Sequence, residues 1–340
     1  MHILIGGYTK HESAGIYQFD FIGSGDQAHL EQRRNVVEVG GPTYFQKDGQ
    51  FIFTIKNENK NENGQGGIAA FANGKLVSQL LHEGSSPAYI GINKEKKLLY
   101  TANYHTGVLA VISYDDQGQL TLLDQVKHEN KALGPRPEQA GAHPHYFDET
   151  PGGHLVSCDL GQDRVDFYGF DGQKLTHLAS YQNEDGFGSR HLAFSPDGKY
   201  FYVAGELSSQ VNVVKFDEEN WMFRSLATYS TIPESWDQHN GAAAIRLSSD
   251  GKFLYVSNRG HDSIAVFAVL PDQALKLVQR VSTFGEFPRD FNWDAEEKYV
   301  IAANQNSNNA TLYQRQSDGT LTPLEKDIAV PEGTRVLFTD

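Results

Sequence analysis

Short apolar runs, rich in aromatic and β-branched residues, recur along the whole chain and are separated by glycine, proline and polar residues. Such runs are typical of β-strands on a partly buried surface, and helical periodicity is weak throughout. One kind of run ends in a small or polar pair and is found at 2–8, 51–57, 98–104, 154–160, 200–207, 253–259 and 299–305. The pattern predicts an all-β protein built from a sevenfold repeat.

The repeat has a nearly constant length. Its equivalent positions lie 46 to 56 residues apart and are Gly7, Asn57, Asn103, Asp159, Gly205, Asn258 and Asn304. A second apolar run follows each copy, and a shorter strand that ends in a turn signal such as KDG, PDG or SDG precedes most copies. A period of about 50 residues with four strands per repeat is that of a propeller blade. We therefore predict a seven-bladed β-propeller with four-stranded blades.

The two ends of the sequence carry complementary parts of one blade. The chain starts directly with the run at 2–8, whereas a strand of the preceding kind stands alone at 334–340. We expect this last strand to complete the first blade and so close the ring. No linker interrupts the repeat, which predicts a single domain over 1–340. A polar segment at 56–67 is expected to be a solvated loop between the second and third strands of its blade.

Net charge and cysteine content limit the partners and the compartment that are expected for this protein. The formal net charge is -14, which argues against nucleic acid and anionic membranes as partners. Cys158 is the only cysteine and lies within an apolar strand, where a structural role and a reducing compartment are expected. Because the N-terminus lacks a basic segment followed by a long apolar one, we expect a cytoplasmic protein. The oligomeric state stays open.

Strand order points to one face of the propeller. Neighbouring strands of a blade are antiparallel, so the first strand starts at the end where the second strand finishes. Around that end the sequence places several arginines and histidines together with carboxylates and amides. The starts of the first strands supply Pro87, Tyr89, His143, His145, Arg190, His191, His239, Asn240, Pro288 and Arg289. The ends of the second strands supply Asn57, Asn103, Tyr104, His105, Asp159, Glu206, Asn258, Arg259, Asn304 and Gln305.

Arginines from three blades, Arg190, Arg259 and Arg289, stand out against the acidic background. Guanidinium groups bind anions through paired, charge-assisted hydrogen bonds, so we expect an anion site. The asparagines after the second strands are more simply explained as turn caps, and Asp159 fits either a turn or the site. His143 and His145 could share a metal, but Pro144 separates them and no third ligand is evident. Neither a metal nor a cofactor is expected, since G-x-S-x-G, G-x-G-x-x-G, P-loop and H-E-x-x-H motifs are all missing.

Several longer stretches resemble the propeller-type lactonase family, whose best-known activity is 6-phosphogluconolactonase. They span nearly the whole chain in the family's order: GGYT with GIY, SPAYIGIN (86–93), GPRPEQAGAHPH (134–145), DLGQDRV (159–165), the segment 190–214, the segment 250–267, FPRDFNWD (287–294) and AANQNSNNATLY (302–313). The resemblance implies functional roles for His143, Arg190, Glu206, Arg259 and Arg289. Ser189 and Gly205 replace the family's usual proline and asparagine, which is expected to loosen the backbone beside Arg190 and Glu206.

The resemblance implies hydrolysis of a small anionic sugar lactone, without a metal. We expect His143, Glu206 and Arg259 to be catalytic, with His143 ranked above Glu206 as the general base that activates water. Substrate or phosphate binding is expected from Arg190, Arg289, His191, Asp159 and Gln305. Two alternatives stay open, because a related branch of the fold cyclises muconates and propellers also serve as non-catalytic interaction scaffolds.

Overall fold

The computed structural model describes residues 1–58 and 64–339, which form seven four-stranded antiparallel sheets. Contacts divide the chain into two compact units. Unit 1 consists of Met1–Thr43 and Tyr229–Asp340, and unit 2 consists of Tyr44–Thr228. Unit 1 contains three of the sheets and unit 2 contains four.

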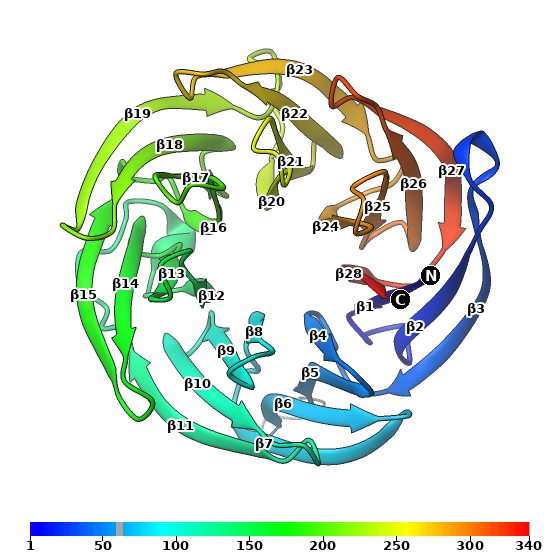
Figure 1. Ribbon diagram of the computed structural model, residues 1–340, viewed down its shortest axis with the longest axis horizontal. Helices are drawn as coiled ribbons and strands as arrows, with labels where there is room; N and C mark the ends of the chain where they lie inside the picture. The colour runs from blue at the N-terminus through cyan, green and yellow to red at the C-terminus, as the bar shows by residue number, and fades with distance from the viewer. Residues whose placement is uncertain (59–63, 340) are drawn as a thin grey trace. The chain divides into compact units, whose positions relative to one another are not determined.

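Each sheet of unit 2 is a meander of consecutive strands (Figure 1). The first sheet contains β4 (Phe45–Asp48), β5 (Phe51–Asn57), β6 (Gln65–Ala72) and β7 (Lys75–Glu83). The second contains β8 (Tyr89–Asn93), β9 (Leu98–Asn103), β10 (Val108–Tyr114) and β11 (Leu120–Lys127). The third contains β12 (Pro144–Glu149), β13 (Leu155–Asp159), β14 (Arg164–Phe170) and β15 (Leu175–Gln182), preceded by the 3-10 helix η2 (Pro137–Gln139). The fourth contains β16 (Ser189–Phe194), β17 (Tyr200–Gly205), β18 (Gln210–Asp217) and β19 (Met222–Ser230).

Two sheets of unit 1 are meanders of the same kind. One contains β20 (Gly241–Leu247), β21 (Phe253–Arg259), β22 (Ser263–Val269) and β23 (Leu275–Ser282). The other contains β24 (Pro288–Trp293), β25 (Tyr299–Asn304), β26 (Asn309–Arg315) and β27 (Leu321–Ala329). The third sheet has the order β28-β1-β2-β3 and contains β28 (Gly333–Thr339), β1 (His2–Gly7), β2 (Gly15–Ile22) and β3 (His29–Glu38), with the 3-10 helix η1 (Gly25–Gln27) before β3.

The pairing of β28 with β1 joins the C-terminal strand to the N-terminal blade. Its register runs from His2 opposite Thr339 to Gly6 opposite Arg335. The predicted closure of the ring is thereby confirmed, as is the fold class, a seven-bladed β-propeller with four-stranded blades. The predicted loop at 56–67 lies between the second and third strands of its blade as expected, since β5 ends at Asn57 and β6 begins at Gln65. Residues 59–63 of that loop lie outside the described residues.

Two of the turn signals have a clear backbone reason. In PDG and SDG the glycines Gly198 and Gly251 have φ angles of 69° and 72°. Such angles cost little for glycine and are strained for most other residues. Each glycine donates its N–H to the carbonyl of a serine three residues earlier, Ser195 or Ser248. The tight turns set where each second strand begins, and therefore where it ends.

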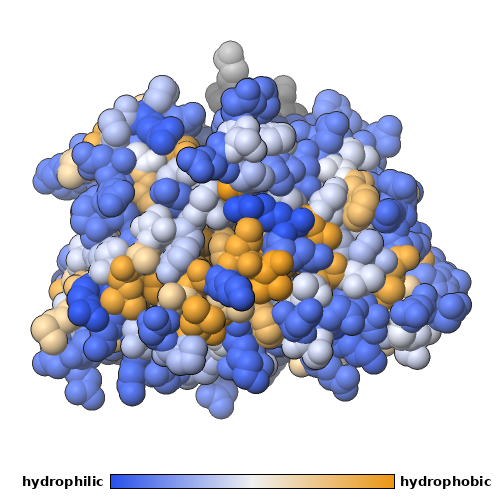
Figure 2. All heavy atoms as spheres, turned by 90° about the horizontal axis from the view of Figure 1, so that it is seen from above, coloured by the Kyte–Doolittle hydropathy of each residue, from blue (hydrophilic) through white to orange (hydrophobic). Residues whose placement is uncertain are grey.

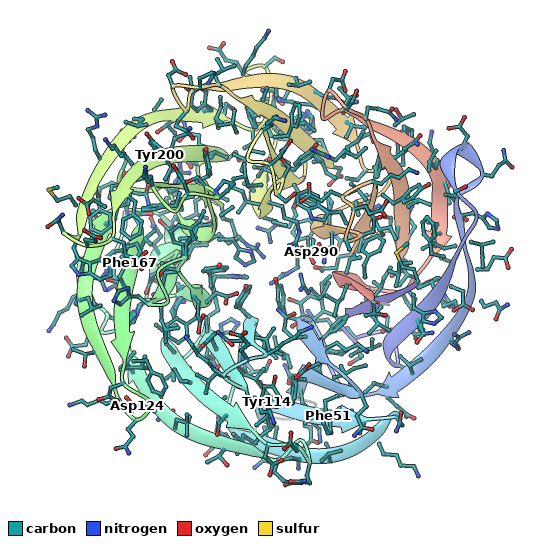
Figure 3. All side chains as sticks on the ribbon, viewed as in Figure 1. Phe51, Tyr114, Asp124, Phe167, Tyr200 and Asp290 are labelled. Carbon is teal, nitrogen blue, oxygen red and sulfur yellow. The ribbon has the colours of Figure 1, made fainter. Side chains whose placement is uncertain are left out.

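Aromatic and aliphatic side chains fill the spaces between blades. In unit 2, Phe167 of β14, labelled in Figure 3, is fully buried and lies 5.0 Å from the Phe216 ring and 5.2 Å from the Phe223 ring. Cys158 belongs to the same cluster, and burial raises its pKa well above the usual value for a thiol. Its environment fits the structural role predicted for it. In unit 1, Ile3 and Ile5 of β1 pack with Val336 of β28 and Ile301 of β25.

The surface seen in Figure 2 is mostly hydrophilic, with hydrophobic residues gathered in groups between the polar ones. Exposed hydrophobic side chains come mainly from the fourth strands of the blades, such as Leu76 of β7, Leu122 of β11 and Met222 of β19. No helix among the described residues is long or apolar enough to cross a membrane.

Candidate active site

The pairing registers bring the start of each first strand opposite the end of the second strand. In unit 2, Pro144 lies opposite Asp159 and Ser189 lies opposite Gly205. In unit 1, Gly241 lies opposite Arg259 and Pro288 lies opposite Asn304. Within each of these blades, the two groups of candidate residues therefore meet at one end of the sheet, as predicted.

The first strands that carry a bulge at this place include β12, β16 and β24. The registers shift between Pro144 and Tyr146, between Ser189 and His191, and between Pro288 and Asp290. The extra residues are His145, Arg190 and Arg289. A bulge inserts one unpaired residue and turns its side chain out of the normal alternation, and bulges are common beside active sites. The backbone thus gives these three polar side chains a special orientation.

Arg190 and Glu206 form an ion pair in unit 2. Arg190 Nε lies 2.7 Å from Glu206 Oε2, and the arginine is almost completely buried. The backbone N–H of Glu206 donates to the carbonyl of Gly188, which fixes the segment that follows β17. The pair orders the carboxylate and keeps the guanidinium inside the blade.

The two departures from the family pattern are held by packing. The Ser189 side chain is buried and accepts a hydrogen bond of 2.9 Å from Asn183. A Cβ at position 205 would lie 2.4 Å from the Ser208 hydroxyl and 2.8 Å from the Phe187 ring, so Gly205 leaves room for both. Both residues are thus packed against their neighbours, and the loosening of this backbone stays a prediction.

His191 lies in a group of aromatic rings contributed by consecutive blades of unit 2. Its neighbours are the rings of Tyr44, Tyr89 and Tyr146, with centroid distances of 6.4, 5.4 and 5.5 Å. Tyr89 donates to Asp148 Oδ2 at 2.8 Å, and burial together with that carboxylate raises the Tyr89 pKa well above its ordinary value. The hydroxyl stays protonated at neutral pH and acts as a donor.

His145 and His191 form a pair of imidazoles. His145 Nδ1 lies 3.1 Å from His191 Nε2, and Arg190 Nη1 lies 3.5 Å from the same His191 nitrogen. A direct N–H···N bond needs one nitrogen that donates and one that accepts. With both rings protonated this bond would be lost, so the pair holds at most one positive charge while it is intact.

His143 is fixed in one tautomer. Its Nδ1 lies 2.7 Å from the backbone carbonyl of Tyr104, which can only accept, so Nδ1 carries a proton. The ring stacks on Tyr104 with a centroid distance of 4.3 Å and an angle of 9°. Nε2 is then the nitrogen with a free lone pair in the neutral ring. Burial and the nearby His143 lower the pKa of His105.

Asp159 is completely buried. Its Oδ1 accepts from the backbone N–H groups of His143 at 2.9 Å and Gln162 at 3.1 Å, and its Oδ2 lies 2.6 Å from His128 Nδ1. All three hydrogen bonds of this carboxylate go to neighbouring segments of the chain. In this structure Asp159 therefore holds the backbone at His143, and its expected part in substrate binding stays a prediction.

The remaining predicted residues belong to unit 1. Arg259 is 5% exposed, donates to the carbonyls of Gly241 and Ala242 at 3.2 and 3.4 Å, and lies 5.2 Å from the centre of the Phe287 ring. Arg289 donates to the Tyr8 hydroxyl at 3.3 Å. The backbone N–H of Gln305 donates to the Phe287 carbonyl, so Arg259 and Gln305 share one neighbour.

The structure gathers several of the predicted residues of unit 2 into one group, whereas in unit 1 Arg289 contacts Tyr8 and Arg259 contacts Phe287. In unit 2, the Tyr104 ring contacts the rings of His143 and His145. His145 contacts His191, which also contacts Arg190. Arg190 forms the ion pair with Glu206. Among the described residues, no group of three or more histidine, cysteine, aspartate or glutamate side chains is arranged to hold a metal ion.

The sequence analysis assigned no role to the tyrosines that accompany this group, although it placed Tyr89 at the start of a first strand. Tyr44, Tyr89 and Tyr146 each follow a proline by two positions, at the start of three consecutive first strands, and neighbouring rings are tilted against each other with centroids 4.6 and 4.7 Å apart. This repeated P-x-Y was the available signal, because equivalent positions of neighbouring blades lie side by side. Tyr8, the partner of Arg289, is the last residue of the run at 2–8 and was not named as a candidate.

Blade number and strand order define the class of protein, a seven-bladed β-propeller with four-stranded blades. The chain belongs to the family described as "Lactonase, 7-bladed beta-propeller", whose model matches residues 2–338. A relative from Bacillus subtilis (strain 168) named 6-phosphogluconolactonase is 35% identical, over 98% of this chain and 97% of that protein.

Two solved structures are also similar. A protein from Lactobacillus plantarum is 43% identical, with a TM-score of 0.94 over 100% of this chain and 99% of that chain. The periplasmic gluconolactonase of Pseudomonas aeruginosa is 28% identical, with a TM-score of 0.88 over 100% of this chain and 99% of that one. These likenesses agree with the family resemblance of the sequence.

Proposed function

We propose that this protein is a hydrolase of the 6-phosphogluconolactonase type, which opens 6-phosphoglucono-1,5-lactone to 6-phosphogluconate in the pentose phosphate pathway and acts in the cytoplasm. The observation that carries the proposal is the tautomer of His143, whose Nδ1–H is held by the Tyr104 carbonyl while Nε2 is left basic. The 35% identical relative named 6-phosphogluconolactonase supports the choice of substrate.

In the proposed reaction, His143 Nε2 takes a proton from water as the water oxygen attacks the lactone carbonyl carbon. The negative charge moves to the carbonyl oxygen, where a guanidinium stabilises it. When the tetrahedral intermediate collapses, the bond between the carbonyl carbon and the ring oxygen breaks. The ring oxygen then receives the proton from the His143 imidazolium and becomes a hydroxyl, while the acyl group becomes a carboxylic acid that releases its proton to water and ends as a carboxylate.

Glu206 has a different place in this proposal. Its ion pair with Arg190 favours the charged, weakly basic form of the carboxylate, so proton transfer is assigned to His143. Because Arg190 is 1% exposed, its role is to order Glu206 and His191 rather than to bind phosphate. Arg259, which was expected to be catalytic, is assigned here to the oxyanion, and Arg289 keeps its expected role in substrate binding.

The test is an assay of lactone disappearance with 6-phosphoglucono-1,5-lactone and with glucono-1,5-lactone, each corrected for spontaneous hydrolysis. We expect His143→Gln to lower kcat by about 10²- to 10⁴-fold, the usual contribution of a general base. Added imidazole should restore part of the activity. Turnover of His143→Gln at the rate of the unmodified protein would remove His143 from the mechanism.

The assay also separates the alternatives. Hydrolysis of the unphosphorylated lactone at an equal rate would favour a gluconolactonase, the activity in the name of the Pseudomonas aeruginosa structure. A change in dienoate absorbance with a muconate would favour a cycloisomerase. No reaction with any of these compounds would favour a non-catalytic scaffold.

A further inference from the structure

A buried chain of polar groups leads away from His143 into the same blade. Asp159, at the end of β13, accepts the His143 N–H at 2.9 Å and faces His128 on its other side, with 2.6 Å between Asp159 Oδ2 and His128 Nδ1. His128 follows β11 and is 6% exposed. Neither the motifs nor the family resemblance had singled out His128.

The direction of these hydrogen bonds follows from their chemistry. An ionised carboxylate only accepts, so His128 Nδ1 carries a proton and donates it, as do the backbone N–H groups of His143 and Gln162. Three donors from three segments therefore converge on one buried carboxylate. Charge-assisted bonds of this kind are the stronger class of hydrogen bond, and together they fix where the backbone of His143 lies.

His128 is itself held from the far side. Its Nε2 lies 2.7 Å from the Tyr168 hydroxyl, and Tyr168 is 4% exposed. The fully buried Asp166 lies 4.0 Å from the same nitrogen and is bonded to Arg164 at 2.8 Å. The ring cannot turn without breaking these contacts, which means that Nδ1 stays aimed at Asp159.

We propose that His128 is a positioning residue for His143, acting through Asp159. His128 holds Asp159, and Asp159 in turn holds the backbone N–H of His143. The imidazole of His143 is therefore oriented through its main chain and not by a contact with its ring. The proposal rests on the proposed function for its kinetic consequence. Its geometric part, that His128 immobilises the His143 peptide, does not depend on the substrate.

Two variants of similar size and polarity separate the two ring nitrogens. In His128→Asn the amide N–H₂ lies near the place of Nδ1 and keeps a donor toward Asp159. In His128→Gln the amide lies near the place of Nε2, so the contact with Tyr168 is kept and the donor to Asp159 is lost. We expect kcat of His128→Gln to fall about tenfold with little change in KM, and His128→Asn to stay near the unmodified protein.

A control variant comes from the outer end of the network. His177 lies 3.2 Å from Asp166 and 2.9 Å from Ser180, and it is not bonded to Asp159. His177→Gln removes a histidine from the same blade without touching the path to His143, and we expect its kcat to be unchanged. An equal loss of kcat in His177→Gln and His128→Gln would reduce His128 to a structural residue and overturn the proposal.

Hydrogen exchange of the His143 amide gives a second measurement that needs no substrate. We expect this N–H to exchange about tenfold faster in His128→Gln than in His128→Asn, because Asp159 is held less firmly. Equal exchange and equal kcat in the two variants would overturn the proposal. Faster exchange without any change in kcat would also overturn it, because the contact would then not position His143 for catalysis. A protein that hydrolyses no lactone at all would contradict the proposed function, while the exchange experiment would still decide the role of His128.

Discussion

In the ion pair of Arg190 with Glu206, the cation is the more deeply buried partner: the two side chains are 2% and 21% exposed. Arg190 sits in a bulge of β16, and Glu206 directly follows β17, so the pair joins two adjacent strands of one blade. A guanidinium buried to this degree depends on its carboxylate, whereas the carboxylate is partly solvated.

Glu206→Gln should therefore destabilise the protein, by about 3 kcal/mol, because a buried charge loses its counter-charge. The free energy of unfolding from urea titration is the measurement. The matched control is Asp116→Asn, which breaks the ion pair of Asp116 with Lys97 at the surface of unit 2 and should cost less than about 1 kcal/mol. Equal losses in the two variants would show that burial of Arg190 does not govern the stability of the pair.

Stacking on Tyr104 should matter more than the tyrosine hydroxyl. In Tyr104→Phe the ring that supports His143 and the backbone carbonyl that binds its Nδ1 both remain, so kcat should stay near that of the unmodified protein. Tyr104→Ala removes the ring and should lower kcat up to about tenfold, in line with about 0.5–1.5 kcal/mol for an aromatic pair. The comparison is made by steady-state kinetics with the phosphorylated lactone. A larger loss in Tyr104→Phe than in Tyr104→Ala would contradict the stacking argument.

Arg289→Ala should lower kcat/KM about 10- to 100-fold if this guanidinium binds the phosphate, since a hydrogen bond to a charged group contributes about 1.5–3 kcal/mol. The loss should be much smaller with glucono-1,5-lactone, which has no phosphate. Arg224→Ala, at an exposed position of β19, is the control and should leave both substrates unaffected. Equal losses with the two lactones would assign Arg289 to the reacting carbonyl or to the sugar instead.

Alkaline pH should destabilise the protein through its buried tyrosines. Burial raises the pKa of Tyr255 to about 12, while the unfolded chain releases this proton near pH 10. Below pH 10 the proton is bound in both states. As the pH rises from 10 toward 12, only the unfolded state gives it up, so the free energy of unfolding falls by about 1.4 kcal/mol per pH unit for this one group.

Tyr255→Phe isolates that contribution. The variant loses the bonds of the hydroxyl to the Gly319 carbonyl and Arg315 Nε, both 2.7 Å long, and should be less stable at neutral pH. Its decline between pH 10 and 12 should nevertheless be shallower than that of the unmodified protein, as measured by urea unfolding across this range. Parallel curves would show that Tyr255 ionises at its ordinary pH in the folded protein.

The repeat was readable from the sequence because each blade repeats the same order of apolar runs and turn signals. The run predicted at 51–57 coincides with β5, and the run at 253–259 coincides with β21. The closing strand was predictable as well, since a first strand without a successor stood at one end of the chain and a second strand without a predecessor stood at the other.

The finer geometry of the site could not be read in this way. A bulge depends on the register between two strands. No local sequence pattern therefore predicted that Arg190 and Arg289 would be the extra residues in β16 and β24. The tautomer of His143 is set by the backbone carbonyl of Tyr104, which every residue type would supply. The burial of Asp159 depends on His128, 31 residues earlier in the chain.

The pairing of β28 with β1 has a consequence for biosynthesis. His2 and Thr339 contact each other across 337 positions of the sequence, so the sheet that contains β1 stays incomplete until Thr339 has left the ribosome. Until then β1 exposes an unpaired edge, which is a site for wrong pairing with other nascent chains. The hydrophobic side chains of β1 likewise stay incompletely buried until Val336 has been synthesised. This protein is thus expected to need chaperone protection late in translation, when the other blades are already formed.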